Sequence, residues 1–394
     1  MRLPYRVTLT LVMLALLAGC AGSSGAPPSS PTLTASPAET SQPAAVEIWH
    51  GLPQHQAALS AIVDAFTQRT PTLTVRLRAY APAELRAAYQ AAVDSGAGPT
   101  LIITEAEQHA ALIAGGRLAP IPRALTDQLE NLLPRSLTTA GQNETPYGVP
   151  FSLDFPLLFY DRARVSTPPA TLDDLKVAAA EYGLVVTPDL WTTAALHPAL
   201  GEQLAAGAVQ RATLWVFFDT LASFAAAPGV RFEANREALT QREVGLLLAP
   251  ASTYPLLHSV LGSELGTAPL PYAASGDPHP VAQMQYAGFN INNTRAETNA
   301  AEQFVVFLLG EEAQRLWFDA TGQPPVNPAG IVDDALRAAW RETVRSARAA
   351  PLQPAFFSTW LPALDRAILS LIAGAGDPVA LAAELSSLLG EAQE

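Results

Sequence analysis

The chain has 394 residues, of which 49% are hydrophobic and only 15% are charged. This length and composition allow two globular domains with their own cores, and they exclude a chain that is disordered throughout. The formal net charge is -13. Because proteins bind nucleic acids through basic surfaces, this acidic balance argues against a nucleic-acid partner.

The beginning of the chain predicts a secretory signal peptide over residues 1–19. Two arginines precede a short apolar run at residues 9–17, and the run ends at Ala18-Gly19-Cys20. A basic start, a short apolar run and small residues at its end are the three parts of such a signal. The run is too short to serve as a mature membrane span.

The four residues Leu17-Ala18-Gly19-Cys20 resemble a bacterial lipobox. The resemblance implies cleavage before Cys20 and attachment of lipid to its thiol; an ordinary signal peptide followed by a chance cysteine is the alternative. Residues 20–45 would then be the lipidated cysteine and a flexible linker, because a segment rich in Ser, Thr, Pro, Ala and Gly cannot offset its ordering entropy. Cys20 is the only cysteine, so once acylated it leaves no thiol for a disulfide, a nucleophile or a metal.

Residues 46–114 alternate between strand and helix patterns. Strands are predicted at 46–51, 73–77 and 101–103, and helices at 54–69, 82–94 and 105–114. This alternation predicts an α/β fold with a parallel sheet. Ligands bind such sheets at the carboxyl ends of the strands, which makes four residues candidate ligand contacts: Trp49, His50, Thr104 and Glu105.

The stretch 147–161 predicts a buried strand that crosses between two lobes. Gly148, Pro150 and Pro156 punctuate an apolar segment that is rich in aromatic residues. Asp154 needs a partner in these surroundings because burial of an unpaired charge is costly, and that partner is either the backbone or a ligand. Phe151 and Asp154 are therefore added to the candidate contacts.

Beyond this crossing, the patterns predict further strands at 184–186, 244–250 and 284–291. The last of these predicts a second crossing, with Gln285 and Tyr286 as candidate contacts. The segment from 187 to about 227 is helical and rich in alanine. Helices are also predicted at 172–182, 235–242, 297–310, 311–320, 331–346, 357–373 and 377–390.

Landmarks of one family recur along the chain in the family's order. They are Val46–Gly51, 65–75, 98–103, 115–120, Tyr147–Asp161, 244–253 with 268–271, and 304–325. Together they resemble the family 1 extracellular solute-binding proteins of bacterial ABC importers, the maltose-binding-protein type. Two departures are Thr100, where the family has Asp, and residues 187–235, which are shorter and richer in alanine than the family's segment.

The resemblance implies a two-lobe, periplasmic-binding-protein-like fold of type II. Each lobe would be a sheet flanked by helices, joined by hinge crossovers that include a third near 322–325. Lobe 1 would comprise 46–150 and 286–321, and lobe 2 would comprise 151–285 and 322–394. Tyr254 and Trp360 lie where relatives place aromatic residues against the ligand, and Trp191 is either a cleft aromatic or a core side chain.

The resemblance also implies a function, that of a monomeric lipoprotein on the outer face of the membrane. It would capture a small solute, a sugar or an oligosaccharide, and deliver it to the transmembrane subunits of an ABC permease. No cofactor or metal is expected, since the histidines lack ligand spacing and the sequence has neither a phosphate loop nor a Gly-x-Ser-x-Gly motif. The alternatives are presentation of the ligand to a sensor, a glycan-active enzyme that uses Asp154 and Glu105, and a binder of anionic solutes.

Overall fold

The computed structural model describes residues 45–138, 145–273 and 276–391. Residues 43–394 belong to one compact unit. The predicted signal peptide, the lipobox with Cys20 and the linker up to residue 44 lie outside the described residues. Within the described ranges, no helix is long and apolar enough to cross a membrane.

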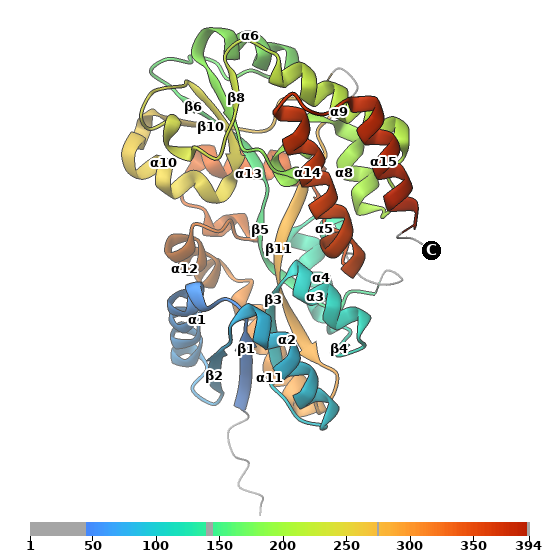
Figure 1. Cartoon of the computed structure of the whole chain (residues 1–394). Coiled ribbons are helices and arrows are strands. Elements are labelled where there is room, and N and C mark those ends of the chain that lie inside the picture. Colours follow the sequence, from blue (N-terminus) through green and yellow to red (C-terminus); the bar gives the residue numbers. More distant parts are fainter. Residues whose placement is uncertain (1–44, 139–144, 274–275, 392–394) are drawn as a thin grey trace, which may run out of the picture. The chain divides into compact units, whose positions relative to one another are not determined.

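The first sheet has seven strands and occupies the lower part of Figure 1. Its strand order is β12-β11-β3-β1-β2, and β4 and β5 also pair with β11. The parallel pairing predicted for the first strands is confirmed, since β1 pairs in parallel with both β2 and β3. The strands are β1 Ala45–His50, β2 Thr74–Ala79, β3 Leu101–Glu105, β4 Leu118–Ala119, β5 Val149–Asp154, β11 Val281–Asn290 and β12 Arg348–Ala349.

Helices cover this sheet because their apolar faces match it. Phe66 of α1 packs edge to face on Phe304 of α11, with ring centroids 5.4 Å apart, and both side chains join the core that contains Ile48 of β1. The helices are η1 Pro53–His55, α1 Gln56–Arg69, α2 Pro82–Asp94, α3 Ala106–Ala114, α4 Arg123–Leu132, α5 Arg135–Thr138, α11 Arg295–Leu308 and α12 Glu311–Thr321.

The second sheet has five strands in the order β10-β6-β9-β7-β8 and lies in the upper part of Figure 1. Its strands are β6 Pro156–Asp161, β7 Leu184–Val186, β8 Val230–Phe232, β9 Leu246–Pro250 and β10 Leu265–Ala268. Successive side chains point to opposite faces of a strand. Accordingly, Leu246 and Leu248 join one core with Phe217 of α9, while Leu247 joins the other core with Trp340 of α13.

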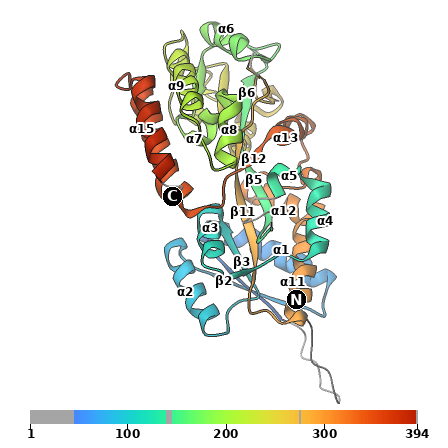
Figure 2. The same ribbon diagram turned by 90° about the vertical axis from the view of Figure 1, so that its right-hand side faces the viewer.

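The second sheet is thus covered on both faces, and Figure 2 shows α15 beside α9 on one of them. The helices around it are α6 Leu172–Tyr182, α7 Leu190–Thr193, η3 Ala194–Leu196, α8 Pro198–Ala205, α9 Arg211–Ala225, η4 Arg236–Ala238, η5 Ala251–Thr253, α10 Tyr254–Leu261, η6 Gly262–Glu264, α13 Asp334–Ser346, η8 Phe356–Trp360, α14 Leu361–Ile372 and α15 Pro378–Glu391. The short η7 Pro328–Gly330 packs against α12 instead.

The predicted crossing at 147–161 consists of two strands rather than one. β5 belongs to the first sheet and β6 to the second, and Phe155 alone separates them. β11 runs antiparallel to β5. The segment 322–325 lies on β5 as well, since the Leu153 amide donates to the Pro324 carbonyl at 3.0 Å. Three chain segments therefore meet where the two sheets are joined.

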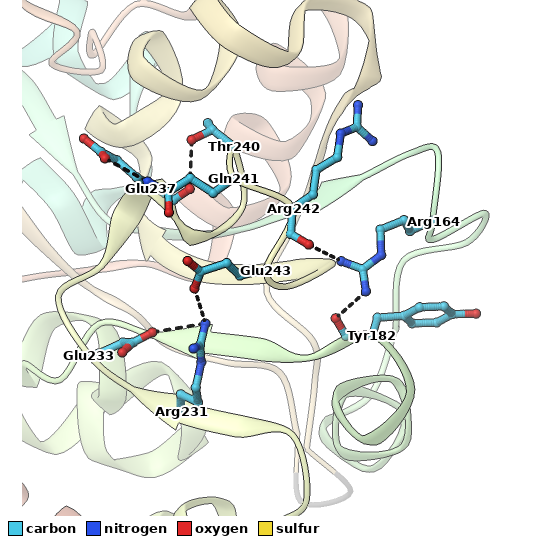
Figure 3. Close-up of polar contacts among 9 residues, drawn as sticks. All are labelled: Arg164, Tyr182, Arg231, Glu233, Glu237, Thr240, Gln241, Arg242 and Glu243. Carbon is cyan, nitrogen blue, oxygen red and sulfur yellow. Dashed lines mark hydrogen bonds and ion pairs between the residues drawn. The ribbon is translucent and has the colours of Figure 1, made fainter.

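The prediction of a helix at 235–242 was wrong, because only the single turn η4 forms there. The chain must reverse into β9, and Arg242 adopts a left-handed φ of 58° to do so. Figure 3 shows how the reversal is held: an Arg164 guanidinium N–H donates to the Arg242 carbonyl at 3.1 Å and another to the Tyr182 carbonyl at 3.2 Å. Arg231 pairs with Glu243 at 3.2 Å in the same view. Tertiary contacts override the helical pattern at this turn.

Candidate ligand-binding cleft

A cleft of about 270 Å³ lies where the crossing strands pass between the two sheets. Its floor consists of polar side chains from β5 and β11. Asp154 is paired in register with Gln283, and Ser152 with Gln285. Because side chains alternate along a strand, Ser152 and Asp154 project to the same side of β5, and Gln283 and Gln285 project to the same side of β11. All four side chains line the cleft.

One wall is the junction between β3 and α3, formed by Glu105, Ala106 and Glu107. Glu105 ends β3 and precedes the first residue of α3, and its side chain makes no capping hydrogen bond to the helix. The side chain is exposed to solvent at the mouth of the cleft. Partial burial by the surrounding protein, with a smaller contribution from the nearby Glu107 carboxylate, raises the pKa of Glu105.

The opposite wall is apolar and largely aromatic, with Trp191 of α7, Phe357 of η8 and Leu361 of α14. Two carboxylates fix the short helix that carries Trp191. Asp189 accepts from the Thr192 amide at 2.7 Å, and Asp365 of α14 accepts from the Leu190 amide at 2.8 Å. These bonds satisfy amides at the helix start. Because Leu190 and Thr192 flank Trp191, the backbone is fixed on both sides of the residue that carries the indole.

The aromatic side chains also support one another behind this wall. The ring of Trp191 meets Phe356 edge to face at 5.9 Å, and Phe356 meets Phe357 in the same way at 5.0 Å. Such edge-to-face pairs are a favoured aromatic geometry. The wall therefore presents two preorganised aromatic side chains, since Trp191 and Phe357 both keep part of their surface accessible.

Asp154 lies deepest among the carboxylates of the cleft and is only 9% exposed. Its Oδ1 accepts from the Ser252 amide at 3.1 Å. Burial raises the pKa of Asp154, and the hydrogen bonds from Ser252 oppose the shift only in part. Gln285 is equally buried, and its Oε1 has no hydrogen-bond partner among the described residues. Both side chains can thus still accept a hydrogen bond from a ligand.

A larger cavity of about 570 Å³ lies elsewhere, between the segment 268–279 and the end of α13. Prolines, together with Tyr272 and the end of α13, form most of its lining. We place the site in the smaller cleft, because there polar groups of both crossing strands face an aromatic wall, which is the usual composition of a small-molecule site. In the part of the chain that the structure describes, no three His, Cys, Asp or Glu side chains could hold a metal ion.

Three of the residues predicted from the sequence line this cleft, namely Glu105, Asp154 and Gln285. The structure does not bring the others to it. Trp49 and His50 are the last two residues of β1, at its carboxyl end, but their side chains turn to other partners. The Trp49 indole donates to Glu47 at 2.6 Å, and His50 is fully buried beside Gln56, with Nε2 and Oε1 2.6 Å apart.

The remaining predicted residues pack in the interior. Thr104 and Tyr286 both contact the buried His109, through a 3.0 Å hydrogen bond and a ring stack at 4.7 Å. Tyr254 stacks on His258 at 5.0 Å. Phe151 and Trp360 are almost fully buried, at 0% and 1% exposure. A large aromatic side chain at these positions gains more from burial than from exposure to the cleft.

Sequence reasoning did not select several residues that line the cleft: Glu107, Ser152, Trp191, Gln283, Gln323, Phe357 and Leu361. The sequence did mark Trp191, because this residue follows the predicted strand 184–186 within a few residues and ligands bind at the carboxyl ends of such strands. Phe357 and Gln323 come from distant segments that the fold brings together. No local pattern marks them.

Residues 61–339 match the family described as bacterial extracellular solute-binding protein. This match covers well over half of the chain. The chain belongs to this family. Its members are described as extracellular solute-binding proteins. The family assignment agrees with the two-lobe architecture, in which each of the two sheets is flanked by helices.

This solute-binding protein has similar relatives of known structure. One is the extracellular solute-binding protein of Staphylococcus aureus in complex with maltose, with a TM-score of 0.73, 14% identity, and coverage of 89% of this chain and 97% of that one. Another is the cyclic α-maltosyl-1,6-maltose-binding protein of Arthrobacter globiformis, with a TM-score of 0.71, 18% identity, and coverage of 89% and 100%. At these identities the similarity establishes the fold.

A relative is also found by sequence, the maltotriose-binding protein of Pyrococcus abyssi. It is 25% identical over 139 residues, which is 35% of this chain. The matched segment spans only 30% of the length of that relative.

Proposed function

We propose that this solute-binding protein captures a sugar or an oligosaccharide in the cleft and delivers it to an ABC permease. The observation that carries the proposal is the pairing of two walls: Trp191 and Phe357 on one side, and carboxylates and amides on the floor and the other side. Sugars have apolar ring faces and hydroxyl edges, so they need an aromatic surface and hydrogen-bonding groups at the same time. The relatives named above bind maltose or related glucans.

We further propose that the ligand contacts are Glu105, Asp154 and Gln285 together with Ser152, Trp191, Gln283, Gln323 and Phe357. The two walls belong to helices that flank different sheets, so a ligand that touches both would favour a closed arrangement. Closure requires that the ligand bind the closed state more tightly than the open one. The two bodies that move relative to each other would be the lobes predicted from the sequence. One comprises 46–150 and 286–321, and the other comprises 151–285 and 322–394.

The proposal includes attachment to the outer face of the membrane through lipid on Cys20. A lipid and a linker over residues 20–45 would keep the binding protein near its permease. Metabolic labelling with a palmitate analogue tests this point, and Cys20→Ala should abolish both the label and the membrane association.

Thermal unfolding in the presence of candidate ligands tests the binding function. The panel should contain maltose, maltotriose, other mono- and oligosaccharides, polyols, glycerol phosphates and short peptides. A ligand present at about 100 times its dissociation constant adds about 2.7 kcal/mol to the stability of the folded state. We expect a rise in the melting temperature with at least one sugar. A shift with a peptide or a phosphate but with no sugar would refute the carbohydrate assignment.

We also propose that the protein binds glycans without cleaving them. Two of its cleft carboxylates, those of Glu105 and Asp154, would act as hydrogen-bond acceptors rather than as an acid and a nucleophile. Long incubation with the bound glycan should release no reducing ends. Release that is lost in Glu105→Gln would instead support the glycosidase alternative.

A further inference from the structure

The charge of the cleft indicates which class of sugar it binds, a conclusion that rests on the proposed function. Three carboxylates line the cleft, those of Glu105, Glu107 and Asp154. None of the described residues that line it is Lys, Arg or His. The polar lining otherwise consists of the amides of Gln283, Gln285 and Gln323 and the hydroxyl of Ser152. The site therefore has negative formal charge and no cation of its own.

The hydrogen-bonding capacity of the site is biased in the same direction. Ionised carboxylates only accept hydrogen bonds. The Ser152 hydroxyl already donates to the Pro324 carbonyl at 3.1 Å, so its proton is not available to a ligand. The Gln285 Oε1 acceptor has no partner in the described structure. The three carboxylates and this oxygen accept hydrogen bonds without donating any, so a ligand that brings donors suits them, while the three glutamine amides can also donate.

At Asp154, the effect of burial outweighs that of the nearby cation. Arg236 of η4 does not line the cleft, and its charge is the weakest of the influences on the pKa of Asp154, which burial keeps above its ordinary value. Closure around a neutral ligand would remove more water from Glu105 and Asp154 without supplying a counter-charge. Such burial of unpaired charge is costly.

We infer that the cleft recognises a glycan with a protonated amino group, such as an oligosaccharide of glucosamine, in preference to neutral or acidic sugars. The ammonium group would donate to the carboxylates at the wall of α3 and supply the missing positive charge. The faces of Trp191 and Phe357 would then contact the sugar rings and attract the cation as well.

A series of matched ligands tests this inference by calorimetric titration at about pH 6, where the amine is charged. The series is a glucosamine trimer, the N-acetylglucosamine trimer, maltotriose and a galacturonic acid trimer. The N-acetylated trimer is the sharpest comparison, because it keeps the ring and loses the charge. We expect the glucosamine trimer to bind at least about tenfold more tightly than the N-acetylated one, and the uronate to bind most weakly.

Glu105→Gln identifies the source of the preference, because it removes one cleft charge without changing the shape of the side chain. We expect it to weaken the glucosamine trimer by about tenfold more than it weakens the N-acetylated trimer, because only the glucosamine trimer loses a charge partner. Glu384→Gln is the matched control, since Glu384 is an exposed acid on α15 outside the cleft, and it should change neither affinity.

The possible results separate the two proposals. Binding of a neutral trimer as tight as or tighter than that of the glucosamine trimer would overturn the inference and leave carbohydrate capture standing. Equal losses in Glu105→Gln and Glu384→Gln would also overturn it, because a preference set by overall protein charge is not one set by the cleft. Failure of every glycan to bind would overturn the proposed function and the inference together.

Discussion

Asp154 illustrates how one residue combines a structural and a ligand-facing role. Its Oδ1 accepts from the Ser252 amide, and the carboxylate lies in the floor of the cleft. Burial raises its pKa in the folded state, so the unfolded chain ionises at a lower pH. Between the two pKa values the folded state holds more protons, and stability therefore falls as the pH rises through this interval.

Substitution of Asp154 should separate these roles. Asp154→Asn keeps an acceptor for the Ser252 amide and removes the charge, so we expect it to be at least as stable as the wild type at about pH 7 and to lose the pH dependence. Asp154→Ala leaves the amide unpaired and should cost about 1–3 kcal/mol. Urea unfolding at about pH 4 and pH 7 measures both effects. An alanine variant as stable as Asp154→Asn would show that the Ser252 bond contributes nothing, because both variants lack the charge.

At the scale of single elements, the entry to β5 is determined by a close contact. A Cβ atom at Gly148 would lie 2.2 Å from Nε2 of His109. The imidazole cannot easily move, since it is fully buried and stacks on Tyr286 of β11 at 4.7 Å. The glycine thus allows the chain to pass over α3 on its way into the crossing.

We expect Gly148→Ala to destabilise the fold by about 1–3 kcal/mol through overpacking. His109→Ala opens space at the same point, so the double variant should lose less than the sum of the two single losses. Denaturant unfolding of the four chains of this cycle provides the coupling energy. Additive losses would mean that the imidazole and the glycine do not constrain each other.

The elements also show what sequence patterns could and could not predict. Long periodic segments were predicted closely, as in α2 at Pro82–Asp94 and α6 at Leu172–Tyr182. Short pairings such as β12 escaped prediction, since they depend on a partner far away in the chain. At the cleft, Glu105, Asp154 and Gln285 were found from strand ends and crossings. Trp49 and Trp360 were not brought there, because position along a strand or helix does not determine which side of it meets the core.

At the scale of the whole molecule, the central feature is the junction of the two sheets. β5, β11 and the segment 322–325 meet there, and the cleft opens beside them. Polar groups on the crossing strands thereby line one cleft with the junction of β3 and α3 of the first sheet and with helices α7, η8 and α14 around the second. A ligand at this junction can link binding to a change in how the lobes are arranged.

The most direct test of this account is calorimetric titration of Trp191→Ala with whichever glycan raises the melting temperature. Trp191 lines the cleft, whereas Trp215 is 46% exposed on α9 and does not line it. We predict that Trp191→Ala weakens binding at least about tenfold, because the sugar loses its stacking surface, while Trp215→Ala binds as the wild type does. Unchanged affinity in Trp191→Ala, with its fold intact, would contradict the placement of the ligand in this cleft.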